Sequence, residues 1–136
     1  MLTGIGKIVA GSSFGFTKAH PSWMVLTCDE QIMRYYQWWV HNSFKDVWGR
    51  SIYQLHAPIA RCHISIVRGE NPEKTKAKVW DQLIGQKVQF EYSNEVNTNG
   101  KHWWLPVKCP RLIEIRRELG LPPSKIPLHM TIGTCA

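Results

Sequence analysis

The chain has 136 residues, enough for one domain with a sizeable apolar core. Apolar residues make up 43% of it and charged residues 20%, which is typical of a globular protein and excludes a disordered one. No apolar run approaches the roughly 18 residues of a membrane span, and the first residues lack the apolar core and cleavage site of a signal peptide. We therefore expect a cytoplasmic protein without a membrane partner.

The net charge is +7, from 17 Lys and Arg residues and 10 Asp and Glu residues. This excess favours an anionic partner, most simply one that carries phosphates, although a basic surface can also serve solubility alone. Seven tryptophans are many for this length, and some of them could stack on nucleobases. The four cysteines are scattered without a C-x-x-C motif, so we expect buried free thiols, no zinc site and no cofactor.

The first half of the chain predicts strands at residues 6–11 and 22–29, followed by a helix at 30–44 that Asp29 can cap. A long loop is expected at 45–58.

The second half predicts a strand at 60–67, and then a short helix at 71–85 with Asn71 as its cap and Pro72 in its first turn. Residues 87–93 and 101–109 should form a hairpin, because an Asn-Gly pair lies between them. A helix at 110–120 and a strand at 127–134 complete the chain. These elements predict a single α+β domain over residues 1–136, without internal repeats or linkers.

The same polar pair occurs in two of these apolar strands. Because side chains alternate between the faces of a strand, His63 and Ser65 share one face, together with Arg61 and Val67. In the last strand, His129 and Thr131 share a face with Gly133. Each strand should therefore bury one apolar face and present a histidine and a hydroxyl on the other.

If the two strands are neighbours, two imidazoles and two hydroxyls converge on one groove. Histidine titrates near neutral pH, so one imidazole could take a proton from an attacking oxygen and the other could give one to a leaving oxygen. The hydroxyls of Ser65 and Thr131, with Arg61, could hold the phosphoryl oxygens. One such pair alone would be an ordinary polar feature of a strand, but two in a small basic chain point to phosphoryl chemistry.

The sequences His63-Ile64-Ser65-Ile66 and His129-Met130-Thr131-Ile132 resemble the paired H-x-[ST]-x motifs of the 2H phosphoesterase superfamily. The order of "WMVLTCD", "HISIVRGE", "VQFEY", "NGKHWWLPV" and "LHMTIG" resembles its phage-encoded branch of RNA-repair-like "Swiss army knife" proteins and anti-CBASS nucleases. The resemblance covers roughly residues 4–134. The first pair has serine where many members have threonine, which keeps the hydroxyl.

This resemblance implies two lobes with antiparallel-rich sheets around a central cleft and helices outside, one motif coming from each lobe. It also implies metal-independent cleavage of a phosphodiester, with a ribose 2′-OH as the attacking group in the anti-CBASS branch. If the protein is phage-encoded, we expect it to be located in the host cytosol.

Three aromatic residues are further candidates for contacting the substrate. Trp103 and Trp104 point to opposite faces of their strand, so one of them could face the cleft and stack on a base. Tyr92 shares a strand face with Val88 and Phe90, which favours a place in the core. Arg68 has the parity of the buried face, unless the strand ends before it.

We expect a two-histidine phosphodiesterase that cleaves 3′–5′ bonds in cyclic di- or oligonucleotides. An enzyme acting on RNA ends, on a 2′,3′-cyclic phosphate or a 2′–5′ linkage, would use the same groups. A third alternative is a module that binds a nucleotide or RNA without turning it over, although binding alone would favour arginine and lysine over paired histidines. The base preference, the oligomeric state and the division of acid and base between the histidines stay open.

Overall fold

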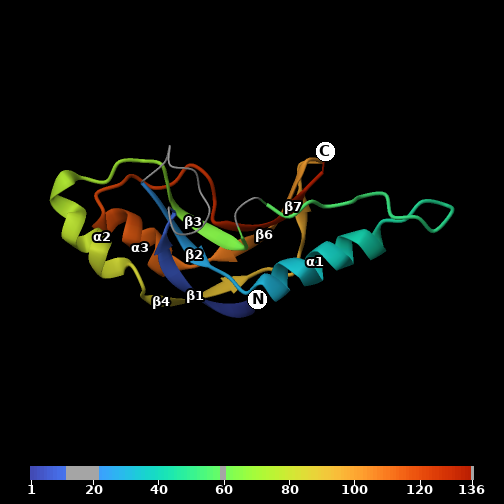
Figure 1. Ribbon diagram of the computed structural model, residues 1–136, viewed down its shortest axis with the longest axis horizontal. Coiled ribbons are helices and arrows are strands. Elements are labelled where there is room, and N and C mark those ends of the chain that lie inside the picture. The colour runs from blue at the N-terminus through green and yellow to red at the C-terminus, as the bar shows by residue number, and fades with distance from the viewer. Residues whose placement is uncertain (12–21, 59–60, 136) are drawn as a thin grey trace.

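The computed structural model describes residues 1–11, 22–58 and 61–135, and these form the expected α+β architecture (Figure 1). The strands belong to a single antiparallel sheet, and the helices lie outside it. The strands are β1 (Leu2–Ala10), β2 (Trp23–Thr27), β3 (His63–Arg68), β4 (Lys87–Tyr92), β5 (Asn97–Thr98), β6 (His102–Lys108) and β7 (His129–Thr134). The helices are α1 (Glu30–Ser43), α2 (Ala77–Leu83), which follows a 3₁₀ turn at Lys74–Lys76, and α3 (Pro110–Glu118).

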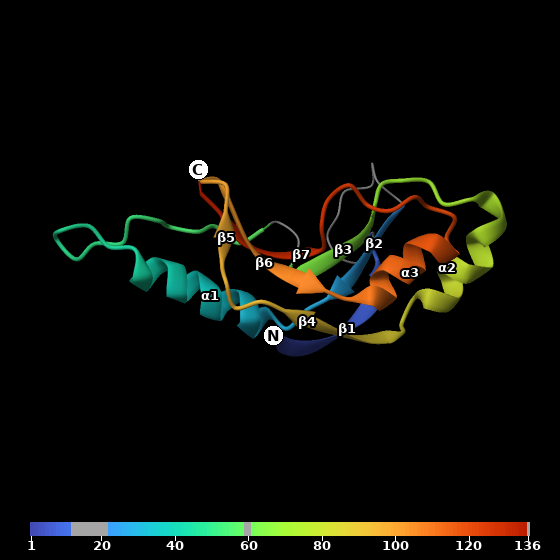
Figure 2. The same ribbon diagram turned by 180° about the vertical axis from the view of Figure 1, so that it is seen from behind.

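The strand order is β4-β1-β2-β3-β7-β6-β5, and β4 also pairs with β6. This additional pairing joins Glu91 to Lys108 and Tyr92 to Val107, so the sheet closes on itself. The closed sheet encloses the apolar core, in which Ile64, Leu105 and Met130 are fully buried. Helices α2 and α3 lie at one end of the molecule, whereas α1 and the segment after it extend from the other end (Figures 1 and 2).

Two segments of the chain have the same local plan. The order β2–α1–β3 in the first half is matched by β6–α3–β7 in the second, and each ends in a strand that begins with a histidine. Each helix packs against the final strand of the other segment, α1 against β7 and α3 against β3. The single strand pairing between the two segments joins Ile64 of β3 to Met130 of β7.

Most element predictions are confirmed. Asp29 caps α1 by accepting a hydrogen bond from the backbone N–H of Gln31 at 2.9 Å, as its position before the apolar stripe indicates. The chain turns out of α3 through Gly120, whose φ of +73° is a left-handed conformation that favours glycine.

Three element predictions need correction. The first strand begins at Leu2, four residues before its expected start. The helix expected to begin at Asn71 begins at Ala77, and Asn71 instead accepts a hydrogen bond from Ser22. The Asn99-Gly100 turn does not join the two long strands directly, because the short strand β5 comes between them and pairs with β6. None of the helices in the described part of the chain has the length and apolarity needed to cross a bilayer.

Candidate functional site

The pairing of β3 with β7 brings the two H-x-[ST] motifs together. Because Ile64 lies opposite Met130 in an antiparallel register, the flanking residues place His63 beside Thr131 and Ser65 beside His129, on the face opposite the core. These four side chains line one cavity of about 180 Å³, which we call the central cavity. Its wall is completed by Trp23 of β2 and Arg68 of β3.

Both histidines are held by the same contact. Nδ1 of His63 lies 2.6 Å from the carbonyl oxygen of Arg61, and Nδ1 of His129 lies 2.9 Å from the carbonyl oxygen of Pro127. A carbonyl oxygen can only accept, so Nδ1 carries the proton and donates it in both cases. The nitrogen that exchanges protons in each ring is therefore Nε2. The backbone two residues before each histidine fixes this arrangement.

A β-bulge follows the hydroxyl residue on each motif strand. Val25 pairs with Ser65 and Met24 with Val67, so Ile66 is an extra residue on β3. On β7, Trp104 pairs with Thr131 and Trp103 with Gly133, so Ile132 is the extra residue.

The bulge on β3 explains a wrong assignment of strand faces. Alternation alone places Val67 on the face of His63 and turns Arg68 to the core. The extra residue reverses the alternation, so Val67 is fully buried in the core and Arg68 lines the central cavity. There Nη2 of Arg68 lies 3.5 Å from Nε2 of His129. Arg68 is thus the cation at the site.

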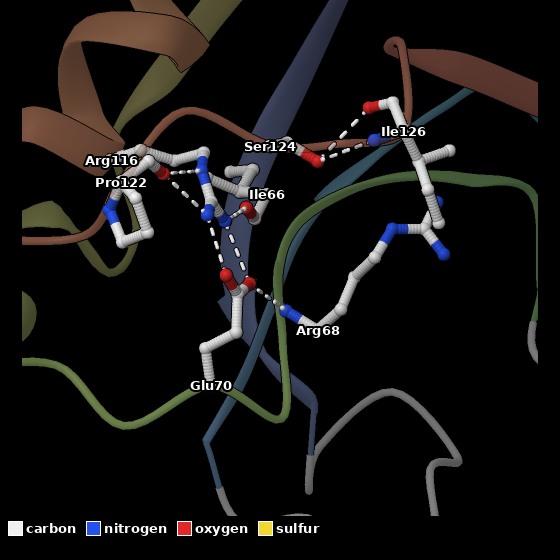
Figure 3. A network of polar contacts seen from close by, with 7 residues as sticks. All are labelled: Ile66, Arg68, Glu70, Arg116, Pro122, Ser124 and Ile126. Carbon is white, nitrogen blue, oxygen red and sulfur yellow. Dashed lines mark hydrogen bonds and ion pairs between the residues drawn. The ribbon is translucent and has the colours of Figure 1, made fainter.

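The bulge on β3 is braced by a buried arginine of α3 (Figure 3). Nη1 of Arg116 donates to the carbonyl oxygen of Ile66 at 3.0 Å and to Oε1 of Glu70 at 2.7 Å, and Nη2 completes the ion pair with Oε2. Glu70 in turn accepts a hydrogen bond from the backbone N–H of Arg68 at 3.2 Å. This network fixes the conformation of the bulge and of the turn after it. It therefore also fixes the backbone position from which the Arg68 side chain extends.

The bulge on β7 is braced in the corresponding way from α1. Nε2 of Gln37 donates to the carbonyl oxygen of Ile132 at 2.7 Å. Gly133, the next residue, lies so close to Leu55 that an added Cβ would come within 2.8 Å of the leucine Cβ. The two bulges that shape the site therefore both have their extra carbonyl bound by a helix side chain.

A larger cavity opens beside His129, and we call it the side cavity. Its volume is about 710 Å³, and it shares Arg68, His129 and Thr131 with the central cavity. Its remaining wall comes from β5, β6 and the segment before β7, including Trp104. The two cavities thus adjoin at these three shared residues, and we call them together the cleft.

The electrostatic surroundings lower the pKa of both histidines. Burial is the largest cause for each, and the positive charge of Arg68 adds to it, while the hydrogen bond from Nδ1 to the backbone carbonyl opposes it. The surroundings differ in three respects. His129 lowers the pKa of His63 and the carboxylate of Glu30 raises it, whereas His102 lowers the pKa of His129 further.

The structure separates the other sequence-predicted site residues. Trp104 lies in the cleft, with its ring centroid 6.4 Å from that of His129 at an angle of 68°. Trp103 is buried against Phe44 and Tyr53, and Tyr92 is buried against Phe90, so both belong to the core. Both side chains point into the core because of their positions in the alternation of strand faces.

Arg61 is exposed and is not among the residues that line either cavity. It meets the site through its backbone carbonyl, which accepts the Nδ1–H of His63.

Arg68, Arg116 and Gln37 are the functional and bracing residues that sequence reasoning missed. Arg68 is the last residue of β3, and its side chain lies at the site because of the bulge at Ile66, for which a single sequence holds no signal. Arg116 and Gln37 act through contacts with strands 50 and 95 positions away, for which a single sequence holds no signal.

Comparison with known proteins adds no relative: no family model, curated protein or solved structure matches this chain. Among the residues that the structure describes, no group of three His, Cys, Asp or Glu side chains is placed to hold a metal ion.

Proposed function

We propose that this protein is a phosphodiesterase that cleaves a 3′–5′ bond of a ribonucleotide by acid–base catalysis between His63 and His129. One observation carries the proposal: the two H-x-[ST] pairs meet in one cavity, each with Nδ1 fixed on a backbone carbonyl and Nε2 left as the proton-exchanging atom. A binding module has no need for two imidazoles held in the same tautomer.

His129 is proposed as the general base and His63 as the general acid. Arg68 lowers the pKa of both histidines, but its guanidinium faces Nε2 of His129, and His102 favours the neutral form of His129 further. Glu30, which accepts a hydrogen bond from the backbone N–H of Cys62 next to His63, favours the charged form of that histidine. We base the proposed division of roles on the contact between Arg68 and His129 and on these two neighbouring groups.

The reaction proceeds as an in-line transfer within the substrate. Nε2 of His129 takes the proton of the ribose 2′-OH, the 2′-oxygen attacks phosphorus, and the bond between phosphorus and the 5′-oxygen breaks. Nε2–H of His63 gives its proton to the departing 5′-oxygen. The products are a 2′,3′-cyclic phosphate and a 5′-hydroxyl, so atoms and charge balance without a further reactant.

The remaining residues of the central cavity stabilise the charge that develops on phosphorus. Ser65, Thr131 and Arg68 line the same cavity as the two histidines. Preorganised donors of this kind contribute most when charge shifts onto the phosphoryl oxygens. A bound phosphodiester also raises the pKa of both histidines through its negative charge, which helps to charge His63.

Small cyclic oligonucleotides are the proposed substrates, and the two-lobed 2H phosphoesterase fold is the proposed relationship. Both rest on the motif resemblance, and the matched β2–α1–β3 and β6–α3–β7 segments support the second. The basic composition and the Trp104 face in the cleft suit a nucleotide ligand. A cytoplasmic location in the host cell is part of the same proposal.

The test incubates the protein, in excess EDTA, with cyclic dinucleotides, cyclic trinucleotides, 2′–5′ dinucleotides and RNA ending in a 2′,3′-cyclic phosphate. Products are resolved by mass, with a His63→Ala preparation as the control for contaminating nucleases. Linear products that end in a 2′,3′-cyclic phosphate support the proposal. Opening of the RNA end alone would replace it with an RNA-processing activity, and tight binding without turnover would replace it with a binding module.

A further inference from the structure

The segment that follows α1 carries an exposed apolar tip. Figure 1 shows this segment beyond α1, where it reaches the end of the longest axis of the molecule. Lys45 and Ser51 form an isolated bridge, and together with the residues between them they make a turn that we call the tip loop (residues 45–51). Within it Val47 is 92% exposed and Trp48 is 76% exposed. Two adjacent apolar side chains that are so open to water favour an apolar partner outside the chain.

The backbone of the tip loop is satisfied by the loop itself. The carboxylate of Asp46 accepts hydrogen bonds from the backbone N–H groups of Trp48 at 2.8 Å and Arg50 at 3.0 Å. The carbonyl oxygen of Asp46 accepts from the N–H of Gly49 at 3.0 Å, and the N–H of Asp46 donates to the carbonyl oxygen of Arg50 at 2.8 Å. A turn whose N–H groups are bonded internally loses little when it moves from water into apolar surroundings.

The outer side of the turn is open as well as fixed. Gly49 has a φ of +77°, a conformation that favours glycine, and no atom lies within 4 Å of the place where a Cβ would be. The tip loop therefore presents Val47 and Trp48 on a preformed convex end.

This convex end is too small for a stable contact between two protein surfaces. An aromatic side chain buries about 150–250 Å², so Trp48 with Val47 falls well short of the roughly 800 Å² that each partner gives to a standard interface. A bilayer sets no such requirement, because its fluid boundary layer accepts an apolar side chain without a matching pocket. Tryptophan is also enriched at the boundary between lipid headgroups and acyl chains.

The charges of the tip loop indicate which kind of bilayer it suits. Lys45 and Arg50 are two cations against the single carboxylate of Asp46, whose Oδ2 lies 3.1 Å from Nε of Arg50. The loop thus has one net positive charge, and the whole chain has a net charge of +7. Basic side chains beside an apolar tip are attracted to anionic headgroups.

We propose that the tip loop binds the surface of an anionic membrane, with Val47 and Trp48 inserted at the headgroup boundary and Lys45 facing the lipid phosphates. The contact is weak and reversible, since even one myristoyl chain gives only marginal binding. It needs no spanning helix. It therefore replaces the expectation of no membrane partner, which was drawn from the lack of a spanning segment. It does not depend on the proposed phosphodiesterase activity.

Sedimentation of the full chain with sucrose-loaded vesicles tests this proposal. The wild type should bind vesicles of phosphatidylcholine mixed with phosphatidylglycerol at roughly millimolar lipid, and bind pure phosphatidylcholine more weakly. Trp48→Ser should weaken binding to the mixed vesicles about tenfold and Lys45→Gln about fivefold. Ile113→Ser, at an exposed isoleucine of α3, is the matched control and should bind as the wild type does.

Brominated lipids separate insertion from the attraction of any basic protein to an anionic surface. Lipids with brominated acyl chains should quench the tryptophan fluorescence of the bound protein, and Trp48→Phe should lose most of this quenching while it still sediments with the vesicles. Absence of vesicle binding, or binding that Trp48→Ser leaves unchanged, would overturn the proposal. Light scattering that detects a dimer dissociated by Trp48→Ser would also overturn it, and would assign the tip loop to a contact between two copies that includes the exposed Tyr35 and Trp38 of α1.

Discussion

Arg68 and His129 meet in the cleft, with Nη2 of the guanidinium 3.5 Å from Nε2 of the imidazole. A guanidinium can only donate, so it faces the nitrogen lone pair of the neutral ring. The contact favours the neutral form of His129 and places a positive charge in the cleft, where the proposed function needs one. Both consequences can be measured.

Replacing Arg68 by glutamine should raise the pKa of His129 and of His63, because the removed positive charge lowers both in the wild type. The base must be deprotonated to act, so the acidic limb of the pH profile of kcat/KM should move to higher pH. Turnover at its optimum should fall about 10²-fold, the usual cost of one lost oxyanion donor. NMR titration of the imidazole protons measures the pKa values directly. Unchanged titration curves in Arg68→Gln, with Arg117→Gln as the control at an exposed arginine of α3, would contradict this role.

Replacing His63 or His129 by alanine should each lower turnover by about 10²–10⁴-fold, the scale of a general acid or base. Both side chains project from the strand face opposite the core, so the circular dichroism spectrum should not change. His41→Ala, at an exposed position of α1, is the matched control and should retain full turnover. Wild-type turnover in either cleft variant would exclude the two-histidine mechanism.

A substrate with a 5′-bridging sulfur should distinguish the acid from the base. Sulfur is a better leaving group than oxygen and departs without protonation, so the general acid becomes unnecessary. Turnover of His63→Ala should therefore recover on this substrate, while that of His129→Ala should stay low. Single-turnover rates for both variants on the sulfur and oxygen substrates provide the comparison. Recovery of His129→Ala instead would reverse the two assignments.

A 2′-deoxy substitution at the scissile nucleotide should abolish cleavage while binding largely persists. The described cleft offers Ser65 and Thr131 hydroxyls, but neither has the dedicated base and orienting carboxylate of a protein nucleophile. A ribose 2′-OH next to the phosphate is already held at high effective concentration. Affinity and turnover of 3′,3′-cyclic GMP-AMP and its deoxy analogue give the test. Equal cleavage of the two would show that water or a protein side chain attacks in place of the ribose.

Replacing Glu70 by glutamine should destabilise the fold by about 1–2 kcal/mol at neutral pH, because the buried Arg116 would lose its charged partner and the 36% exposure of the Glu70 side chain screens part of the interaction. Arg111→Gln, in the exposed ion pairs of α3, should cost less than about 1 kcal/mol. Denaturant unfolding of the three proteins measures these differences.

The same ion pair predicts a pH dependence. The hydrogen bonds from Arg116 lower the pKa of Glu70, and the charge of Arg68 adds to this. A carboxylate with a lowered folded pKa stabilises the protein above its unfolded pKa of about 4, and this contribution is lost as the pH falls through the folded pKa. The wild type should therefore lose more stability in acid than Glu70→Gln does. Parallel curves would assign the stabilisation to contacts other than the ion pair.

The face of each strand could be predicted from the sequence as far as the alternation lasts. His63, Ser65, His129 and Thr131 lie on the expected faces because they precede the bulges. Arg68 follows a bulge, and a run of alternating residues holds no signal that a bulge will interrupt the alternation. The sequence also predicts that Trp103 and Trp104 point to opposite faces, but it does not predict which of them is buried. The side chains that bury Trp103 include Phe44 and Tyr53, which are distant in the sequence.

The braces of the cleft were beyond sequence reasoning for a different reason. Gln37 has the pattern of an exposed helix position, and Arg116 lies in a strongly charged helix. Their roles depend on which backbone carbonyl lies next to them in the folded protein. Each helix packs against the final strand of the other segment, and this crossing determines which carbonyl that is.

This crossing has a consequence for how the protein unfolds. Since α3 holds the bulge of β3 and α1 holds the bulge of β7, neither segment keeps its motif strand in shape without the helix of the other. Closure of the sheet through β4 and β6 adds a second junction between them. Loss of structure in one segment therefore removes support from the other, and thermal melting should be one all-or-none transition in which both histidines lose their surroundings together.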